Sequence, residues 1–205
     1  MALVEPRFVE GPVPAEWPTR PTFSNEEGRY HAAIPIDPGT SLYGTGETAG
    51  PLLRNGAITE TWAEQPFRNP PPPGLSPLEY DDDSLNLYQA HPWVLAVRSD
   101  GSSFGVLADT TYRARIDLTD GIEFSVNAAF PVIVIEGATP QEVLTKLGGL
   151  TGTIELPPLW SLGYQQARWS YIPDSKVREI ADEFRTRSIP CDVLWVDIDY
   201  MDGFK

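Results

Sequence analysis

The sequence is short of cysteine, histidine and positive charge, and each shortage excludes a class of protein. Its 205 residues include a single cysteine, Cys191, so no internal disulfide framework is expected. A histidine metal site or a hydrolase triad would have to use His31 or His91, the two histidines of the chain. The formal net charge of -14 leaves no basic surface for a nucleic acid or an anionic membrane. We therefore expect no metal, no cofactor, and neither a nucleic acid nor a membrane as a partner.

Long apolar runs are also missing from the sequence. No window approaches the run of about 18 to 20 apolar residues that crosses a bilayer. The segment MALVEPR at residues 1–7 lacks the basic region and the apolar core of a secretory signal. These two absences predict a soluble protein in the cytoplasm.

Frequent turn residues punctuate the first three quarters of the chain and predict an all-β unit. The sequence contains 21 prolines and 17 glycines, which break most candidate helices. The clearest pair of strands, residues 93–98 and 103–108, is joined by a turn whose Asp100-Gly101 favours a hairpin. The whole pattern indicates an antiparallel β-sandwich over residues 1–156. Further strands are expected at 112–118, 122–126 and 131–136, and an exposed loop is expected at the proline-rich residues 69–74 and the acidic residues 81–83.

The spacing of apolar residues changes after residue 138. Residues 139–149 combine an N-cap threonine, a first-turn proline and a glycine stop, and predict a short linking helix. Two prolines then mark the start of a second unit, residues 157–205. Strand-like stretches at 161–169 and 193–198 flank a helix, which is typical of a βαβ unit with parallel strands. The apolar face of this helix follows the i, i+3, i+4, i+7 spacing of Val177, Ile180, Ala181 and Phe184.

Acidic and aromatic side chains follow the two predicted parallel strands. Ligands of parallel α/β folds bind at the C-terminal ends of the strands. Asp197 and Asp199 follow the second strand, and they would share one face of an extended stretch. Trp169, Trp195 and Tyr200 lie near the same strand ends. Because a sugar offers an apolar face to aromatic rings and hydroxyl groups to carboxylates, these residues favour a sugar site.

Six short stretches form a specific set of motifs. Those in the second unit are PPLWSLGYQQ at residues 157–166, RWSY at 168–171, IPCD at 189–192 and WVDIDYMDG at 195–203. Those in the first are LYGTGE at 42–47 and LYQAHPW at 87–93. Together they resemble family 31 of the glycoside hydrolases, the α-glucosidase family, over most of the chain.

The resemblance implies an α+β multidomain fragment, in which a galactose-mutarotase-like β-sandwich precedes the first βαβ unit of a (β/α)8 barrel. It also implies retaining hydrolysis of α-linked glucosides or glucans by two aspartates. Neither catalytic residue is expected in this chain, because both belong to later strands of a barrel of about 250 residues. What carries over is part of the substrate pocket, where Asp197 would bind glucose hydroxyls and Trp169 would line the same subsite.

Secondary candidates for substrate binding are Trp195, Asp199 and Tyr200 at the strand ends, with Trp62 and Glu64 in the sandwich. In the family an aspartate usually follows the sandwich tryptophan three residues on, whereas this chain reads Trp62-Ala63-Glu64-Gln65. We therefore expect the N-terminal part of an enzyme, which binds an oligosaccharide or glucan substrate but does not hydrolyse it alone. The alternative is a non-catalytic carbohydrate-binding module in which the sandwich is the working part.

Overall fold

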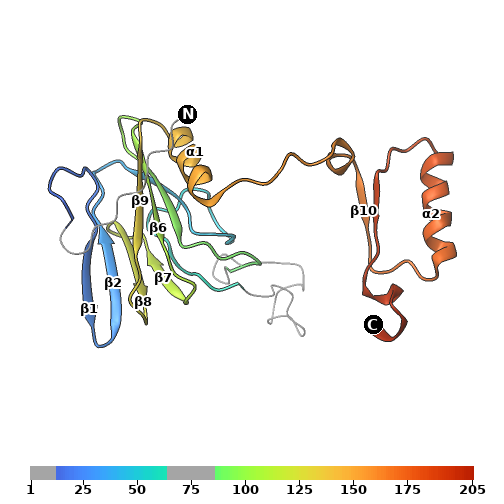
Figure 1. Cartoon of the computed structure of the whole chain (residues 1–205), viewed down its shortest axis with the longest axis horizontal. Helices are drawn as coiled ribbons and strands as arrows, with labels where there is room; N and C mark the ends of the chain where they lie inside the picture. The colour runs from blue at the N-terminus through green and yellow to red at the C-terminus, as the bar shows by residue number, and fades with distance from the viewer. Residues whose placement is uncertain (1–12, 64–85) are drawn as a thin grey trace. The chain divides into compact units, whose positions relative to one another are not determined.

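The computed structural model of the chain describes residues 13–63 and 86–205 (Figure 1). The loop predicted at residues 69–74 and 81–83, and the candidate Glu64, lie outside these described residues. The chain divides into two compact units, Met1–Gly152 and Thr153–Lys205.

The first unit contains two antiparallel sheets, as predicted. In the five-stranded sheet the strands lie in the order β1-β2-β8-β7-β4, and in the four-stranded sheet in the order β3-β5-β6-β9. The five-stranded sheet consists of β1 (Thr22–Glu26), β2 (Arg29–Ile34), β8 (Ile122–Val126), β7 (Ala114–Asp117) and β4 (Ile58–Glu60). The four-stranded sheet consists of β3 (Ser41–Gly44), β5 (Trp93–Val97), β6 (Ser103–Ala108) and β9 (Val132–Gly137).

One hydrophobic core joins the two sheets into a sandwich. Along β5 and β7 buried side chains alternate with partly exposed ones, because successive residues of a strand point to opposite faces. Burial of each large apolar side chain stabilises the fold by about 1.5–3 kcal/mol. The core includes Ile34, Ile116, Ile122 and Phe124 from the five-stranded sheet and Leu42, Val94, Phe104 and Val106 from the other.

The hairpin predicted at residues 93–108 is confirmed as β5 and β6. Val97 pairs with Ser103, and the turn is closed by a hydrogen bond from the Gly101 N–H to the Arg98 carbonyl, 2.9 Å long. Gly101 has a φ of +87°, the left-handed conformation that glycine adopts at no steric cost. Asp100-Gly101 therefore forms the turn for the reason that the sequence suggested.

The hairpin of β1 and β2 was not predicted from the sequence. Its strands pair from Thr22 with Ala33 to Glu26 with Arg29, which leaves only Glu27-Gly28 in the turn. Both turn residues have positive φ, 51° for Glu27 and 85° for Gly28, as a two-residue turn of this handedness requires. A glutamate rarely takes this conformation, so the dipeptide Glu-Gly predicts a hairpin turn less strongly than Asn-Gly or Asp-Gly does.

The predicted linking helix is α1 (Pro140–Thr151), but the predicted glycine stop is wrong, because the helix continues through Gly148 and Gly149 and its C-cap is Gly152. The Thr139 side chain accepts a hydrogen bond from the Glu142 N–H, and the Glu142 carboxylate accepts one from the Ala138 N–H. These two bonds satisfy the N–H groups of Glu142 and Ala138 at the start of the helix. The helix lies against β6 and β9, and its Val143 side chain is buried.

The second unit is the predicted βαβ unit, with shorter strands than expected. Strands β10 (Gln165–Ala167) and β11 (Val193–Trp195) pair in parallel, and α2 (Asp174–Thr186) connects them. The strand expected at 161–169 is wrong at its start, because Leu159–Leu162 forms a 3-10 turn. That turn is closed by a hydrogen bond from the Gly163 N–H to the Trp160 carbonyl. Within the described residues, no helix is long and apolar enough to cross a membrane.

Candidate functional site

The register of the two parallel strands brings Trp169 and Asp197 to the same edge. Ala167 pairs with Trp195 at the end of the ladder, and Trp169 and Asp197 each lie two residues beyond this pair. Figure 1 shows β10 alongside the strand that follows α2, and both lead into loops at the same end. Because parallel strands end at a common edge of a sheet, the two side chains belong to one cluster of strand-end residues.

Asp197 begins a 3-10 turn, Ile198–Tyr200 (η2), and caps it with its own side chain. The carboxylate Oδ1 accepts a hydrogen bond from the Ile198 N–H at 2.7 Å. Within the described residues no hydrogen bond or ion pair engages Oδ2. The side chain is half-buried, so one oxygen is fixed by the turn while the other is available to a ligand.

The expectation that Asp197 and Asp199 share one face of an extended stretch is wrong. Strand β11 ends at Trp195, and Asp199 lies inside the 3-10 turn that Asp197 caps. A 3-10 turn has about three residues per turn, so alternation no longer relates the two carboxylates. The physical cause is the capping bond of Asp197, which competes with continuation of the strand.

Three exposed aromatic residues lie at or just beyond these strand ends in the sequence. Trp169, Trp195 and Tyr200 are 73%, 58% and 61% exposed, respectively. The indole N–H of Trp195 donates to the Gln165 side-chain oxygen on the neighbouring strand, at 2.6 Å. Trp195 is thus held by a hydrogen bond, whereas a large part of its ring stays open to a ligand.

Gln165 was not singled out from the sequence. Its contribution depends on the pairing of β10 with β11, which residue spacing alone does not reveal. Arg168 is a second such residue, because its guanidinium lies over the ring of buried Tyr171, 5.4 Å from the centroid. This contact holds the backbone on either side of Trp169.

The two sandwich candidates lie apart from this cluster in the sequence. Trp62 follows β4 in the first unit and is 48% exposed, with the Arg113 guanidinium over its ring at 5.3 Å. Glu64 falls outside the described residues. The structure therefore groups the strand-end candidates in the second unit and describes Trp62 in the first.

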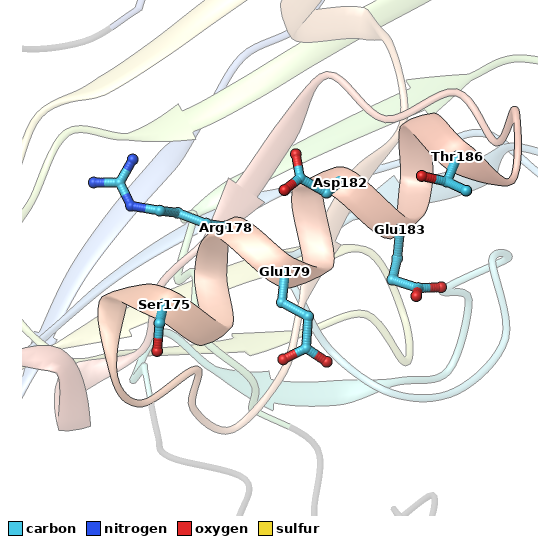
Figure 2. A pocket seen from close by; sticks show the side chains of 6 residues that line it. All are labelled: Ser175, Arg178, Glu179, Asp182, Glu183 and Thr186. Atoms are coloured by element: carbon cyan, nitrogen blue, oxygen red, sulfur yellow. The ribbon is translucent and has the colours of Figure 1, made fainter.

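A shallow hollow on α2 lies on the polar side of that helix. Figure 2 shows Glu179 and Glu183 extending from one side of the helix, and Arg178 and Asp182 from another. Ion pairs within the helix, such as Arg178 with Asp174 at 3.5 Å, account for this arrangement as a solvated face. The hollow contains no aromatic ring, so we assign no sugar site to it; its lining residues are Ser175, Arg178, Glu179, Asp182, Glu183 and Thr186.

No metal centre accompanies the strand-end cluster in the described part of the chain. Among residues 13–63 and 86–205, no group of three or more histidine, cysteine, aspartate and glutamate side chains is arranged to hold a metal ion. Cys191 is a free, buried thiol whose Sγ lies 3.4 Å from the Val193 carbonyl oxygen. The chemistry available at the strand ends is therefore hydrogen bonding by carboxylate and amide groups and stacking on aromatic rings.

Comparison with known proteins extends over both units. Residues 11–117 match the N-terminal galactose mutarotase-like domain of glycosyl hydrolase family 31. Residues 154–205 match the TIM-barrel domain of the same family. Alpha-glucosidase 2 of Bacillus thermoamyloliquefaciens is 38% identical over 174 residues, which are 83% of this chain and 21% of that protein.

Solved structures show the same relationship. The family 31 alpha-glucosidase of Bacteroides thetaiotaomicron is 44% identical with a TM-score of 0.73, over 89% of this chain and 29% of its own. A family 31 dextranase of Flavobacterium johnsoniae, complexed with isomaltotriose, is 28% identical with a TM-score of 0.74, over 87% of this chain and 21% of its own. The chain thus spans between a fifth and a third of the length of these relatives. With both units matched in order, the chain belongs to glycosyl hydrolase family 31.

Proposed function

We propose that this chain forms the N-terminal part of a retaining α-glucosidase-like glycoside hydrolase and supplies part of its glucose pocket. The substrate is an oligosaccharide or glucan with α-linked glucose units. The nucleophile and the acid/base belong to barrel strands outside these 205 residues, so the chain alone binds sugar without hydrolysing it. A cytoplasmic location stays a prediction.

The observation that carries the proposal is the shared position of Trp169 and Asp197, two residues beyond the last pair of β10 and β11. In a (β/α)8 barrel this end of the strands forms the floor of the active site. An indole ring and a carboxylate at neighbouring strand ends match the two kinds of surface on a glucose ring. We assign them the stacking role and the hydroxyl-binding role, respectively.

The capping bond of Asp197 suits it to this role. The Ile198 N–H holds Oδ1 at 2.7 Å and so fixes the orientation of the whole carboxylate before a ligand arrives. A hydroxyl group that donates to an ionised carboxylate makes a stronger bond than one that donates to a neutral acceptor, by about a factor of two. Preorganisation of this kind increases affinity because less side-chain entropy is lost on binding.

The remaining strand-end residues have supporting roles in the proposal. Trp195, fixed by Gln165, lines the wall of the pocket, and Tyr200 offers a ring and a hydroxyl group beside it. Asp199 lies inside the turn that Asp197 caps, and its proposed role is a hydrogen bond to a second sugar hydroxyl. Trp62 and Glu64 are proposed to contact more distant units of the substrate.

The names of the relatives support the choice of substrate class. The Bacillus and Bacteroides relatives are alpha-glucosidases, and the Flavobacterium relative is a dextranase complexed with isomaltotriose. All three act on glucose polymers or glucosides, so α-linked glucose is the part that they share. Maltose and isomaltose are therefore the first ligands to test.

A binding module is the second candidate function, and the closed core of the sandwich favours it. Seven antiparallel strand pairings organise the described part of the first unit around one core, without any residue of the second unit. This unit has what a domain needs to fold alone. The candidate predicts that sugar binding survives every substitution at the strand ends of β10 and β11.

Isothermal titration of the chain with maltose and isomaltose tests the proposal. Asp197→Asn keeps an oxygen that can cap Ile198 but removes the charge, so we expect weaker binding by about tenfold or more, the range of one hydrogen bond to a charged group. Asp182→Asn on the polar face of α2 removes the same charge away from the strand ends and serves as the matched control. Equal affinities of the two variants would contradict the assignment, as would hydrolysis of an α-glucoside by the purified chain.

A further inference from the structure

Arg54 carries a buried guanidinium in the loop between β3 and β4. The residue is only 6% exposed, which is unusual for an arginine because a charge is costly to remove from water. Its backbone is fixed, since its N–H donates to the carbonyl of Leu42 at 2.8 Å and Leu42 belongs to the core. The buried position of this side chain is thus set by the core strand β3.

One nitrogen of the guanidinium makes all of the hydrogen bonds of the side chain within the described residues. Nη1 donates to the carbonyls of Ala49 and Pro51, both at 3.3 Å. Gly50 lies between them with a φ of +107°, and a Cβ atom there would come within 3.3 Å of Nη1. The loop is therefore wrapped closely around this nitrogen, but two neutral carbonyls do not neutralise the charge of the group.

The other two nitrogens have no partner in the part of the chain that the structure describes. Nε is enclosed by protein and makes no hydrogen bond. Nη2 makes none either, and it is not among the enclosed atoms. In the planar guanidinium these two nitrogens lie on one edge and present two parallel N–H bonds. This edge is an unpaired fork of two donors that a ligand reaches from the side of Nη2.

No carboxylate compensates the charge of Arg54 among residues 13–63 and 86–205. The guanidinium takes part in no ion pair there, and burial lowers its pKa below the ordinary arginine value. Arg98 shows how the same unit treats another largely buried guanidinium, because it forms an ion pair with Glu136 at 3.2 Å and donates to Thr19 at 2.9 Å. A buried charge without such a partner is strongly destabilising, so an anion is the expected complement of Arg54.

The geometry of the fork selects the class of anion. Two parallel N–H donors match the two oxygens of a carboxylate, and a charged acceptor also neutralises the guanidinium. A neutral sugar hydroxyl would leave the charge uncompensated. The formal net charge of -14 disfavours a phosphate dianion more than a carboxylate, which carries one negative charge. A carboxylate is therefore the ligand that fits this edge.

We propose that Arg54 is the anchor of a carboxylate-binding site in the first unit, and that its Nε and Nη2 hold the carboxylate as a bidentate pair. The carboxylate belongs to a small organic acid or to an acidic side chain of another polypeptide, and both present the same two oxygens. The site goes beyond the proposed function and does not rest on it, because none of its residues belongs to the strand-end cluster of β10 and β11.

Titration of the isotopically labelled chain with sodium acetate tests this site through the arginine Nε–H signals in nuclear magnetic resonance spectra. Sodium chloride is adjusted to hold the ionic strength constant, and Arg54→Lys assigns the Arg54 signal by its loss. We expect a saturable shift of the Arg54 signal, because a carboxylate then accepts a hydrogen bond from Nε. The signal of Arg98, whose carboxylate partner belongs to the chain, should not shift.

Two variants separate the fork from a simple positive charge, with thermal unfolding at increasing acetate as the measurement. Arg54→Lys keeps the charge but loses the parallel donors, so we expect it to bind acetate at least about tenfold more weakly. Arg113→Lys changes an arginine of the same unit whose partner, Glu60, belongs to the chain, and it should keep the full affinity. Near-ultraviolet circular dichroism checks the fold of both variants, and the titration of the parent chain decides the proposal if Arg54→Lys does not fold.

A second titration, with a glutamate whose backbone amine and carboxyl are blocked, identifies the source of the carboxylate. Binding tighter than that of acetate indicates an acidic side chain, whereas equal or weaker binding indicates a small organic acid, and each supports the site. Lack of a shift at Arg54 with both ligands overturns the proposal. An equal shift with sodium chloride alone also overturns it, as does tighter binding of inorganic phosphate than of acetate.

Discussion

Gly105→Ala should destabilise the sandwich through a single side chain. The Trp93 indole lies directly over Gly105 on the neighbouring strand, and a Cβ atom at position 105 would fall 1.9 Å from its Cη2 and 2.5 Å from its Cζ2. Real Cβ atoms do not come so close to another atom, so the indole must move away. Overpacking of this kind costs about 1–3 kcal/mol of unfolding free energy. In a strand without the indole, alanine is instead more stable than glycine by about 0.5–1 kcal/mol.

The expected effect therefore changes sign when Trp93 is also replaced. In the Trp93→Ala background, Gly105→Ala should raise the unfolding free energy, and the double-mutant cycle should give a coupling of about 1.5–4 kcal/mol. Urea unfolding followed by circular dichroism at a β-sheet wavelength measures this coupling, because that signal reports on the two large sheets, which both belong to the first unit. Gly101→Ala adds a Cβ in open space at a φ of +87°, so it measures the cost of backbone strain without overpacking, a strain that Gly105 does not have. If Gly105→Ala lowered the unfolding free energy equally with Trp93 present and with Trp93 replaced by alanine, the packing argument would be refuted.

Three further predictions follow from local contacts. Gly44 has a φ of +106°, and a Cβ there would lie 2.6 Å from the Trp93 carbonyl oxygen, so Gly44→Ala should cost roughly 3 kcal/mol or more in thermal unfolding. Thr139→Ala removes the N-cap of α1 and should cost about 1 kcal/mol in urea unfolding. The hydrogen bond from the Thr119 hydroxyl lowers the pKa of the Asp117 carboxyl below that of an ordinary aspartate, so its contribution to stability is present above the ordinary pKa and is lost as pH falls through the folded pKa. Thr119→Val should accordingly lower the urea midpoint of unfolding near neutral pH, and should lower it less in strong acid. An equal decrease of the midpoint at the two pH values would contradict this prediction.

The sequence predicted the elements whose local signals agree with their tertiary setting. The turn at Asp100-Gly101 needs a positive φ, and Gly101 provides it in the hairpin of β5 and β6. Thr139 caps the start of α1, as predicted, by accepting a hydrogen bond from the Glu142 N–H. In both cases a few adjacent residues supply most of the information, so the prediction did not depend on distant contacts.

Features that depend on pairing between distant strands were harder to predict. The β1–β2 hairpin uses Glu27, a residue without a strong turn preference, and its stability comes from β8 pairing with β2. The strand expected to continue to residue 198 ends at Trp195, because the Asp197 side chain caps a turn instead. The Arg113 contact with Trp62 joins residues more than 50 positions apart, which a pattern within one segment cannot indicate.

The candidate site likewise has features that local sequence predicts and features that depend on pairing between distant residues. Acidic and aromatic residues after apolar strands predicted Asp197 and Trp169 as candidates, and the parallel register of β10 and β11 places both two residues beyond their last pair. The orientation of the carboxylates was wrong, since it depends on where the strand stops. The hydrogen bond that holds Trp195 was not anticipated, since it requires the register of Gln165 against Val193.

Backbone and indole N–H shifts of the isotopically labelled chain, measured by nuclear magnetic resonance during titration with isomaltose, test the central claim most directly. The Ile198 N–H donates to the Asp197 carboxylate at 2.7 Å, so it should report any hydroxyl group that binds the same carboxylate. The account predicts shifts at Ile198 and at the indole N–H of Trp169, and their loss in Asp197→Asn. Shifts confined to the polar face of α2, or identical shifts in the parent chain and Asp197→Asn, would contradict a glucose site at the ends of β10 and β11.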